Sequence, residues 1–215
     1  MISLAGRAWE VVKDAGRTGY NRPMTFLTNF GDAMVVLPVA AVTLAWLTRV
    51  AGGRTAALWC GALLLCGGGT ALLKIYFGAC TAPLESLNSP SGHASMSTLV
   101  YGSLALIVGA EAAPWQRFAA AALGAAAIVG IALSRIVLGA HSMAEVALGL
   151  VIGAVALALF ARRYLETRPA VRHIWPLVAA VALLILVLHG HSAHLEAVWR
   201  AVAGWLHNTA GLCRA

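Results

Sequence analysis

The sequence predicts an all-α protein, a polytopic membrane helix bundle with about six transmembrane helices. Of its 215 residues, 60% are hydrophobic and only 11% are charged. A soluble domain carries roughly 25% charged residues, so this chain has too few charges to cover a soluble surface. The mean hydropathy of +0.83 agrees with an integral membrane protein, and it excludes a disordered chain.

The predicted spans are intervals with no Asp, Glu, Lys or Arg between their end residues. In chain order they run over 32–49, 54–74, 93–111, 117–135, 146–161 and 174–188. Several are short for a hydrocarbon core about 30 Å thick. The glycines at 67–69, and the pair Gly149 and Gly153, are predicted to let neighbouring helices approach closely. A hinge is the alternative at the triple glycine.

Basic residues predict which ends of the spans face the cytoplasm. The stretch 161–173 holds four arginines and is the strongest cytoplasmic signal. Alternation from there places Arg49, Arg54 and Arg117 inside, and it places both tails and the segment 74–93 outside. The basic N-terminal tail opposes this orientation. We divide the chain into an outer-face interfacial N-terminal segment (1–31), a membrane domain (32–190) and an amphipathic C-terminal tail (191–215).

The net charge of +7 would suggest a nucleic-acid partner in a soluble protein. The sequence has no basic stripe with interleaved aromatic residues, so we expect no nucleic-acid partner here. Cationic side chains near a bilayer instead fix topology or face anionic headgroups. Membrane lipids are therefore the expected partners, and the sequence does not indicate an oligomeric state.

The segment 88–93, Asn-Ser-Pro-Ser-Gly-His, ends an irregular loop and opens the third span. Ser91 is a predicted N-cap, and Gly92 permits close approach to the backbone. The free N–H groups and the positive dipole end of a helix attract an anion. His93 is placed to donate a proton to the group that carries this anion. The alternative is an ordinary capped helix start.

Arg135, His141 and Glu145 form a second group, between the fourth and fifth spans. His141 and Glu145 are four residues apart, so they share one face of a helix. A carboxylate that binds one imidazole nitrogen leaves the other as an oriented nucleophile or base. Arg135 is placed to clamp a phosphate through two hydrogen bonds. The alternative is a capping arginine beside a structural His–Glu pair.

These two groups resemble the second and third motifs of the type 2 phosphatidic acid phosphatase family. That family shares its site with vanadium haloperoxidases and bacterial class A acid phosphatases. The matching residues are Pro90-Ser91-Gly92-His93 and Ser134-Arg135 followed by His141. Lys74 stands at the lysine of the first motif, and the lead Thr28–Asp32 into the first span is also similar.

The resemblance implies a role for each matching residue. His141 would attack phosphorus and form a phosphohistidine, which water later hydrolyses. Glu145 would orient His141, and His93 would protonate the leaving oxygen. The phosphate oxygens would be held by Lys74, Ser91, the Gly92 backbone amide and Arg135. The implied mechanism requires no metal and no cofactor.

The chain departs from the family pattern at two places. Glu145 replaces the usual Asp, which adds one methylene of reach to the carboxylate. Thr81 and the residue after it stand where the first motif has Arg and Pro, so the phosphate site is one cation short. Our hypothesis is that an arginine of an outer tail supplies the missing charge, with Arg22 or Arg17 favoured over Arg200.

The sequence therefore predicts a bacterial lipid phosphatase with its phosphatase-like domain at 32–190. The substrate would be a phosphate monoester or diphosphate of a polyprenyl, glycerophospholipid or lipid A type, because headgroups reach helix ends laterally. The predicted location is the inner membrane, with the active site facing the periplasm. A lipid phosphotransferase that uses the same histidine stays open, and so does a catalytically silent protein that binds or transports lipid phosphates.

Three histidines and two cysteines near the predicted outer face are not assigned to the phosphate site. His189, His191 and His194 have a spacing that fits no standard zinc pattern, so we expect a hydrated cluster at the membrane surface. Cys80 and Cys213 are both predicted outside, where a disulfide can form.

Overall fold

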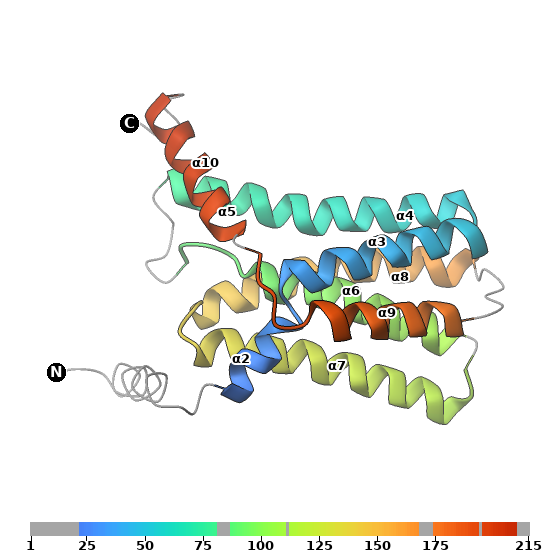
Figure 1. Ribbon diagram of the computed structural model, residues 1–215. Coiled ribbons are helices and arrows are strands. Elements are labelled where there is room, and N and C mark those ends of the chain that lie inside the picture. Colours follow the sequence, from blue (N-terminus) through green and yellow to red (C-terminus); the bar gives the residue numbers. More distant parts are fainter. Residues whose placement is uncertain (1–21, 81–86, 111, 168–173, 194, 210–215) are drawn as a thin grey trace.

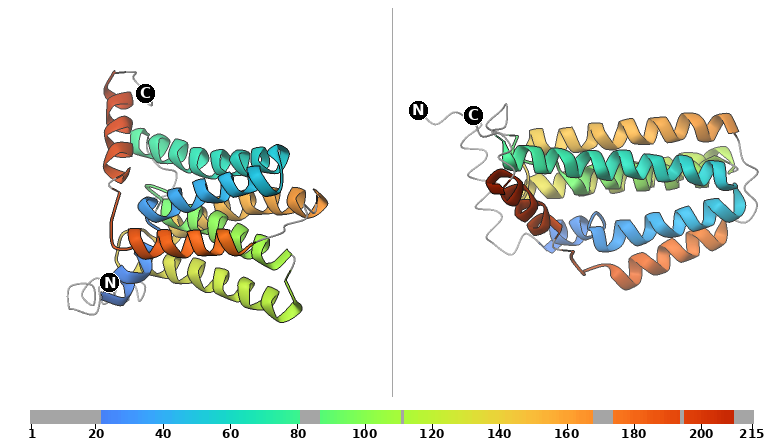
Figure 2. Two further views of the ribbon diagram at one scale, coloured as in Figure 1. Left: turned by 45° about the vertical axis from the view of Figure 1, so that its right-hand side comes forward. Right: turned by 90° about the horizontal axis from the view of Figure 1, so that it is seen from above.

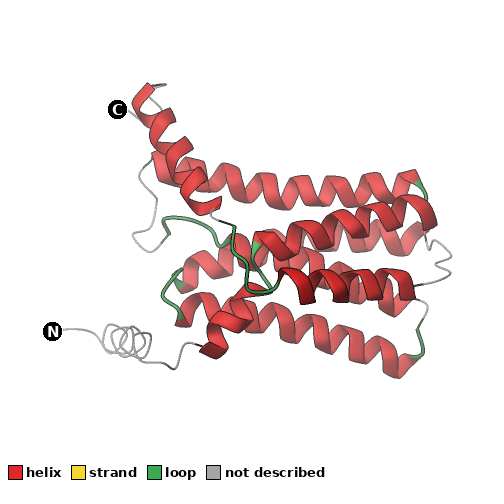
Figure 3. Ribbon diagram, in the orientation of Figure 1, coloured by secondary structure: helices red, strands yellow, loops and turns green. Residues whose placement is uncertain are grey.

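The computed structural model describes residues 22–80, 87–110, 112–167, 174–193 and 195–209. Every element of regular structure in these ranges is a helix, as Figure 3 shows. In chain order they are α2 (Arg22–Asn29), α3 (Ala33–Val50), α4 (Gly53–Leu63), the π-helix η2 (Leu64–Gly68), α5 (Gly69–Ala79), α6 (Gly92–Ala110), α7 (Pro114–Val137), α8 (Met143–Thr167), α9 (Trp175–Leu188) and α10 (Leu195–Thr209). The predicted all-α class is confirmed.

Within the described ranges, five helical segments are long and apolar enough to cross a membrane: Arg22–Val50, Gly53–Ala79, Gly92–Ala110, Pro114–Val137 and Met143–Thr167. The sixth predicted span corresponds to α9, an apolar helix of 14 residues. At 1.5 Å per residue α9 is only about 21 Å long, and it lies beside α3 (Figure 1). The prediction of a multi-pass bundle is confirmed, with a sixth helix too short for a full crossing.

The main core lies between α3, α4, α6 and α8. Trp59 of α4 is fully buried, contacts the ring of Phe160, and donates from Nε1 to the Ala40 carbonyl oxygen at 3.2 Å. Other large side chains that are fully buried here are Leu47, Leu99, Ile107 and Tyr164. The outer faces expose apolar side chains such as Leu64 and Leu186. An apolar surface of this kind suits helices surrounded by lipid.

Glycines set how closely α8 approaches α6. A Cβ at Gly149 would lie 2.5 Å from the Ser91 carbonyl oxygen, and one at Gly153 would collide with another carbonyl oxygen of α6. The predicted close approach is therefore confirmed for this pair. A Cβ at Gly68 or Gly69 would meet no atom within 4 Å, so close approach is wrong at those two positions. The chain there forms η2, which joins α4 to α5.

The connections between the helices gather at two opposite ends of the bundle (Figures 1 and 2). At one end lie Arg49, Arg54, Arg117, Arg162 and Arg163. At the opposite end lie α2, the loop 87–91, the turn between α7 and α8, and α10. This separation agrees with the predicted alternation of loops. Which end faces the cytoplasm stays a prediction.

Helix α10 lies over the end of α5 and is inclined to the spanning helices (Figures 1 and 2). Ala203 is buried against Gly78, where a Cβ on the glycine would lie 2.9 Å from the Ala203 Cβ. His207 Nδ1 lies 3.0 Å from the Ala79 carbonyl oxygen. The first turn of α10 is thereby placed beside Lys74. The division of the chain at 31 and 190 stays a prediction.

Candidate functional site

The start of α6 forms one side of the candidate site. Ser91 Oγ accepts a hydrogen bond from the Ala94 N–H at 3.4 Å, which confirms the predicted N-cap. Ser91 is fully buried, and its N–H donates to the Glu145 carbonyl oxygen at 3.0 Å. The Lys74 side chain passes beside Gly92, where a Cβ would lie 3.7 Å from its Cε. The helix N-terminus and the lysine therefore adjoin each other.

Glu145 is buried in the first turn of α8, and its carboxylate accepts four hydrogen bonds. Oε1 accepts from the N–H groups of Asn88 and Ser89 at 2.9 and 2.8 Å. Oε2 accepts from Ser142 N–H at 3.0 Å and from His141 Nδ1 at 2.9 Å. Hydrogen bonds to an ionised acceptor are the stronger kind. One carboxylate thus joins the two loops that carry the sequence motifs.

His141 lies in the turn between α7 and α8, with 8% of its surface exposed. A carboxylate only accepts, so Nδ1 carries the proton and Nε2 keeps its lone pair. Within the described ranges Nε2 makes no hydrogen bond. Burial lowers the pKa of His141, the hydrogen bond with Glu145 opposes this shift, and the charges of Arg135 and Lys74 lower the pKa further. The ring is therefore neutral at neutral pH and can act as a nucleophile.

Lys74 is buried near the end of α5, and its ammonium has two partners. Nζ lies 2.6 Å from Glu196 Oε2 and donates to Ser89 Oγ at 3.0 Å. Ser89 Oγ in turn donates to Glu196 Oε1 at 3.3 Å. Partial burial raises the pKa of Glu196, but the hydrogen bond and the charge of Lys74 outweigh it and lower the pKa. The predicted phosphate lysine is thus paired with a carboxylate from α10.

Arg135 lies in the last turn of α7. Its Nη1 donates to Thr28 Oγ1 of α2 at 2.9 Å. Its Nε is buried and has no hydrogen-bond partner among the residues that the structure describes. An unsatisfied buried donor costs about 1–3 kcal/mol, so this guanidinium has donor capacity that an anion can use.

His93 lies in the first turn of α6, beside Asp32. His93 Nε2 is 3.8 Å from Asp32 Oδ2, which is too long for a hydrogen bond. Asp32 Oδ1 caps α3 by accepting from Met34 N–H, and it also accepts from Ala193 N–H, both at 2.9 Å. A Cβ at Gly31 would lie 3.2 Å from His93 Cδ2, so the glycine lets the ring approach. A fixed carboxylate therefore stands next to the predicted acid.

The structure brings most of the predicted site residues to one end of the bundle. They are Lys74, Gly92, His93, Arg135, His141 and Glu145, and the positive charges of Arg135 and Lys74 act on His93. The Ser91 hydroxyl caps the start of α6. Thr81 and Arg17 fall outside the described residues. Arg22 and Arg200 are exposed and make no hydrogen bond or ion pair within them, so no contact supports a tail arginine as the missing cation.

Sequence reasoning assigned no role to Thr28, Asp32, Ser89 or Glu196. Thr28 and Asp32 bound the lead into the first span, which was matched to the family without a function. Ser89 directly precedes the second motif. Glu196 lies 122 residues after Lys74 and resembles any acidic residue in the first turn of a helix. Only the packing of α10 on α5 reveals it.

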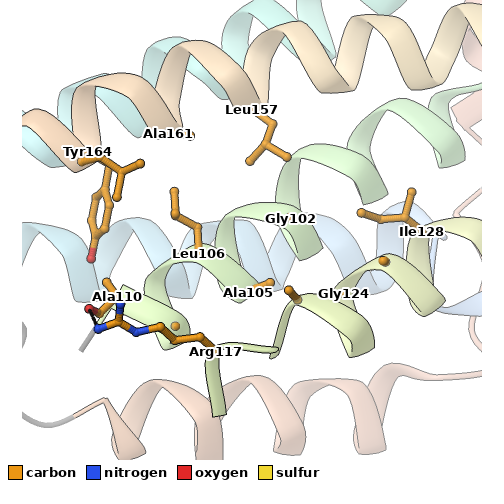
Figure 4. A pocket seen from close by; sticks show the side chains of 14 residues that line it. Gly102, Ala105, Leu106, Ala110, Arg117, Gly124, Ile128, Leu157, Ala161 and Tyr164 are labelled. Carbon is orange, nitrogen blue, oxygen red and sulfur yellow. Dashed lines mark hydrogen bonds between the residues drawn. The ribbon is translucent and has the colours of Figure 1, made fainter. Parts of the chain in front are cut away.

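A cavity of about 680 Å³ lies between α6, α7 and α8, towards the opposite end of the bundle (Figure 4). Small residues such as Gly102, Ala105 and Gly124 line it, with Arg117 and Tyr164 at one end. None of the predicted site residues lines it. The candidate site is thus defined by its hydrogen bonds and charges, and it is separate from this cavity.

The remaining groups of histidines and cysteines lie partly outside the described residues. In the described part of the chain, no group of His, Cys, Asp and Glu is arranged to hold a metal ion. His189 packs on the ring of Phe26, and its Nε2 lies 3.0 Å from the Phe26 carbonyl oxygen. His194 lies outside the described residues. Cys80 is disulfide-bonded, and its predicted partner Cys213 is also outside them.

Fold and site together define a multi-pass helical membrane protein with a histidine–carboxylate pair and two cations at one end of its bundle. The family model described as PAP2 superfamily matches residues 55–170, just over half of the chain. The chain therefore belongs to the PAP2 superfamily, whose members are phosphatases. The matched range contains every predicted site residue. Neither a curated protein nor a solved structure matches the chain significantly.

Proposed function

We propose that the protein is an integral membrane lipid phosphatase that hydrolyses a lipid phosphate monoester or diphosphate through a phosphohistidine. The observation that carries the proposal is the hydrogen bond between His141 Nδ1 and the buried Glu145 carboxylate at 2.9 Å. It leaves a neutral ring with a free Nε2 near the charges of Lys74 and Arg135. Membership of the superfamily supports phosphate-ester hydrolysis as the reaction class.

The proposed reaction has two steps. In the first, the Nε2 lone pair of His141 attacks phosphorus, the P–O bond to the lipid breaks, and a protonated His93 gives one proton to the leaving oxygen and becomes neutral. Glu145 stabilises the positive charge that develops on the His141 ring. In the second, neutral His93 takes a proton from water, which attacks phosphorus and returns the P–N electrons to Nε2. Lys74 and Arg135 offset the charge on the equatorial oxygens.

A lipid substrate is supported by the position of the site. The candidate residues lie at the ends of membrane-crossing helices, where a headgroup can enter laterally while its chains stay in the bilayer. Arginines gather at the opposite end of the bundle, and basic residues favour the cytoplasm. We therefore propose that the site faces outward from a bacterial inner membrane, into the periplasm.

The test is phosphate release by the detergent-solubilised protein over a panel of lipid phosphates. We expect His141→Ala to abolish turnover while leaving the protein folded. A phosphorylated acceptor without free phosphate would identify a phosphotransferase instead. Tight lipid binding without turnover would identify a silent binding or transport protein. Full activity of His141→Ala would remove His141 as the nucleophile.

A further inference from the structure

A carboxylate from outside the family motifs lies among the groups expected to bind phosphate. Glu196 Oε2 is 2.6 Å from Lys74 Nζ, and Glu196 Oε1 accepts from Ser89 Oγ at 3.3 Å. The Lys74 side chain is 5% exposed and that of Glu196 is 48% exposed. The buried lysine is therefore covered by Glu196 from the side of α10.

The charge of Glu196 also acts on other groups of the site. Its negative charge acts on the Arg135 guanidinium. The same carboxylate thus acts on both predicted phosphate-binding cations, Lys74 and Arg135. Carboxylates and phosphates form the same charge-assisted hydrogen bonds with lysine and arginine, so the two anions compete for these partners.

The position of Glu196 does not depend on this ion pair alone. Just before α10, Ala193 N–H donates to Asp32 at 2.9 Å. Farther along the helix, Ala203 packs on Gly78, and His207 contacts the carbonyl oxygen of Ala79. These contacts hold α10 against the bundle on both sides of Glu196. The packing of α10 against the bundle therefore positions the Glu196 carboxylate beside Lys74.

We propose that Glu196 competes with phosphate for Lys74 and Ser89, so that an entering phosphate must displace its carboxylate. A lipid phosphate also gains affinity from each methylene that it buries, and this offsets the displacement. Inorganic phosphate has no such gain. The cost of displacing Glu196 is the same for both ligands, so Glu196 keeps the inorganic phosphate product weakly bound and promotes its release, while a lipid phosphate stays bound through its buried chains. This inference rests on the proposed function of the site.

The test measures binding of radiolabelled inorganic phosphate to the purified full-length protein by equilibrium dialysis. Glu196→Gln keeps the shape and removes the charge, and we expect roughly tenfold tighter binding from the loss of one charged competitor. Glu166→Gln is the matched control, because Glu166 lies at the opposite end of the bundle and is half exposed. It should bind phosphate as the unchanged protein does. Ala203→Leu, which pushes α10 off Gly78, should also tighten binding.

Equal or weaker phosphate binding by Glu196→Gln, with unchanged thermal unfolding, overturns the proposal. If Glu196→Gln does not fold, Ala203→Leu decides the question in the same way. Failure of the proposed function gives a different result, namely no hydrolysis of any lipid phosphate. The dialysis experiment needs no turnover, so the two failures are distinguishable.

Discussion

Glu145→Gln perturbs the residue that connects the two motif-bearing loops. The amide keeps the shape of the side chain but replaces one acceptor oxygen with an NH2 group. At the Oε2 position this group would face the His141 Nδ1–H and the Ser142 N–H. At the Oε1 position it would face the N–H groups of Asn88 and Ser89. In either orientation two donors lose their acceptor and point at a third donor.

The magnitude follows from these contacts. A hydrogen bond to a charged group is worth about 1.5–3 kcal/mol, so two lost bonds amount to about 3–6 kcal/mol. An amide turned towards Asn88 and Ser89 weakens the loop and lowers stability. An amide turned towards His141 removes the preferred tautomer and lowers the rate. If the loss falls on the transition state, kcat decreases by about 10²- to 10⁴-fold.

The assay is the kcat of phosphate release from a lipid phosphate in detergent, with thermal unfolding of the same samples. Glu145→Asp restores the charge but reaches one methylene less, so its kcat should lie between those of Glu145→Gln and the unchanged protein. Glu166→Gln removes an exposed carboxylate at the other end and should change neither quantity. Wild-type kcat and unfolding temperature in Glu145→Gln would refute the reasoning.

Two further predictions concern a titration and a helix contact. An NMR titration of His141 should have its midpoint below the ordinary value of 6.5, because burial and the charges of Arg135 and Lys74 lower its pKa. Only the neutral ring attacks phosphorus, so activity is lost as the pH falls through that midpoint. Lys74→Ala removes one of the positive charges and should raise the midpoint of the His141 titration. Gly153→Ala should lower Tm by roughly 2–12 °C, since overpacking costs about 1–3 kcal/mol. Gly61→Ala, which meets no atom within 4 Å, is its control. A midpoint above 6.5 or an unchanged Tm would contradict these expectations.

The sequence by itself determined the features that depend on local pattern. Charge-free intervals located the spanning helices, because a charge inside hydrocarbon is costly wherever it stands. The spacing of His141 and Glu145 placed both on one helical face, and their side chains are hydrogen-bonded. Ser91 was recognised as an N-cap from its place before a helix. Each of these inferences uses residues only a few positions apart.

Tertiary structure decided the features that join distant segments. The Glu145 carboxylate reaches the loop at Asn88, and Arg135 reaches Thr28 of α2. Glu196 pairs with Lys74 from 122 residues away because Gly78 lets α10 lie against α5. Such contacts depend on how closely and at what angle helices pack, and a local pattern does not encode either quantity. Local sequence therefore identified the reactive groups, and packing determined which charges surround them.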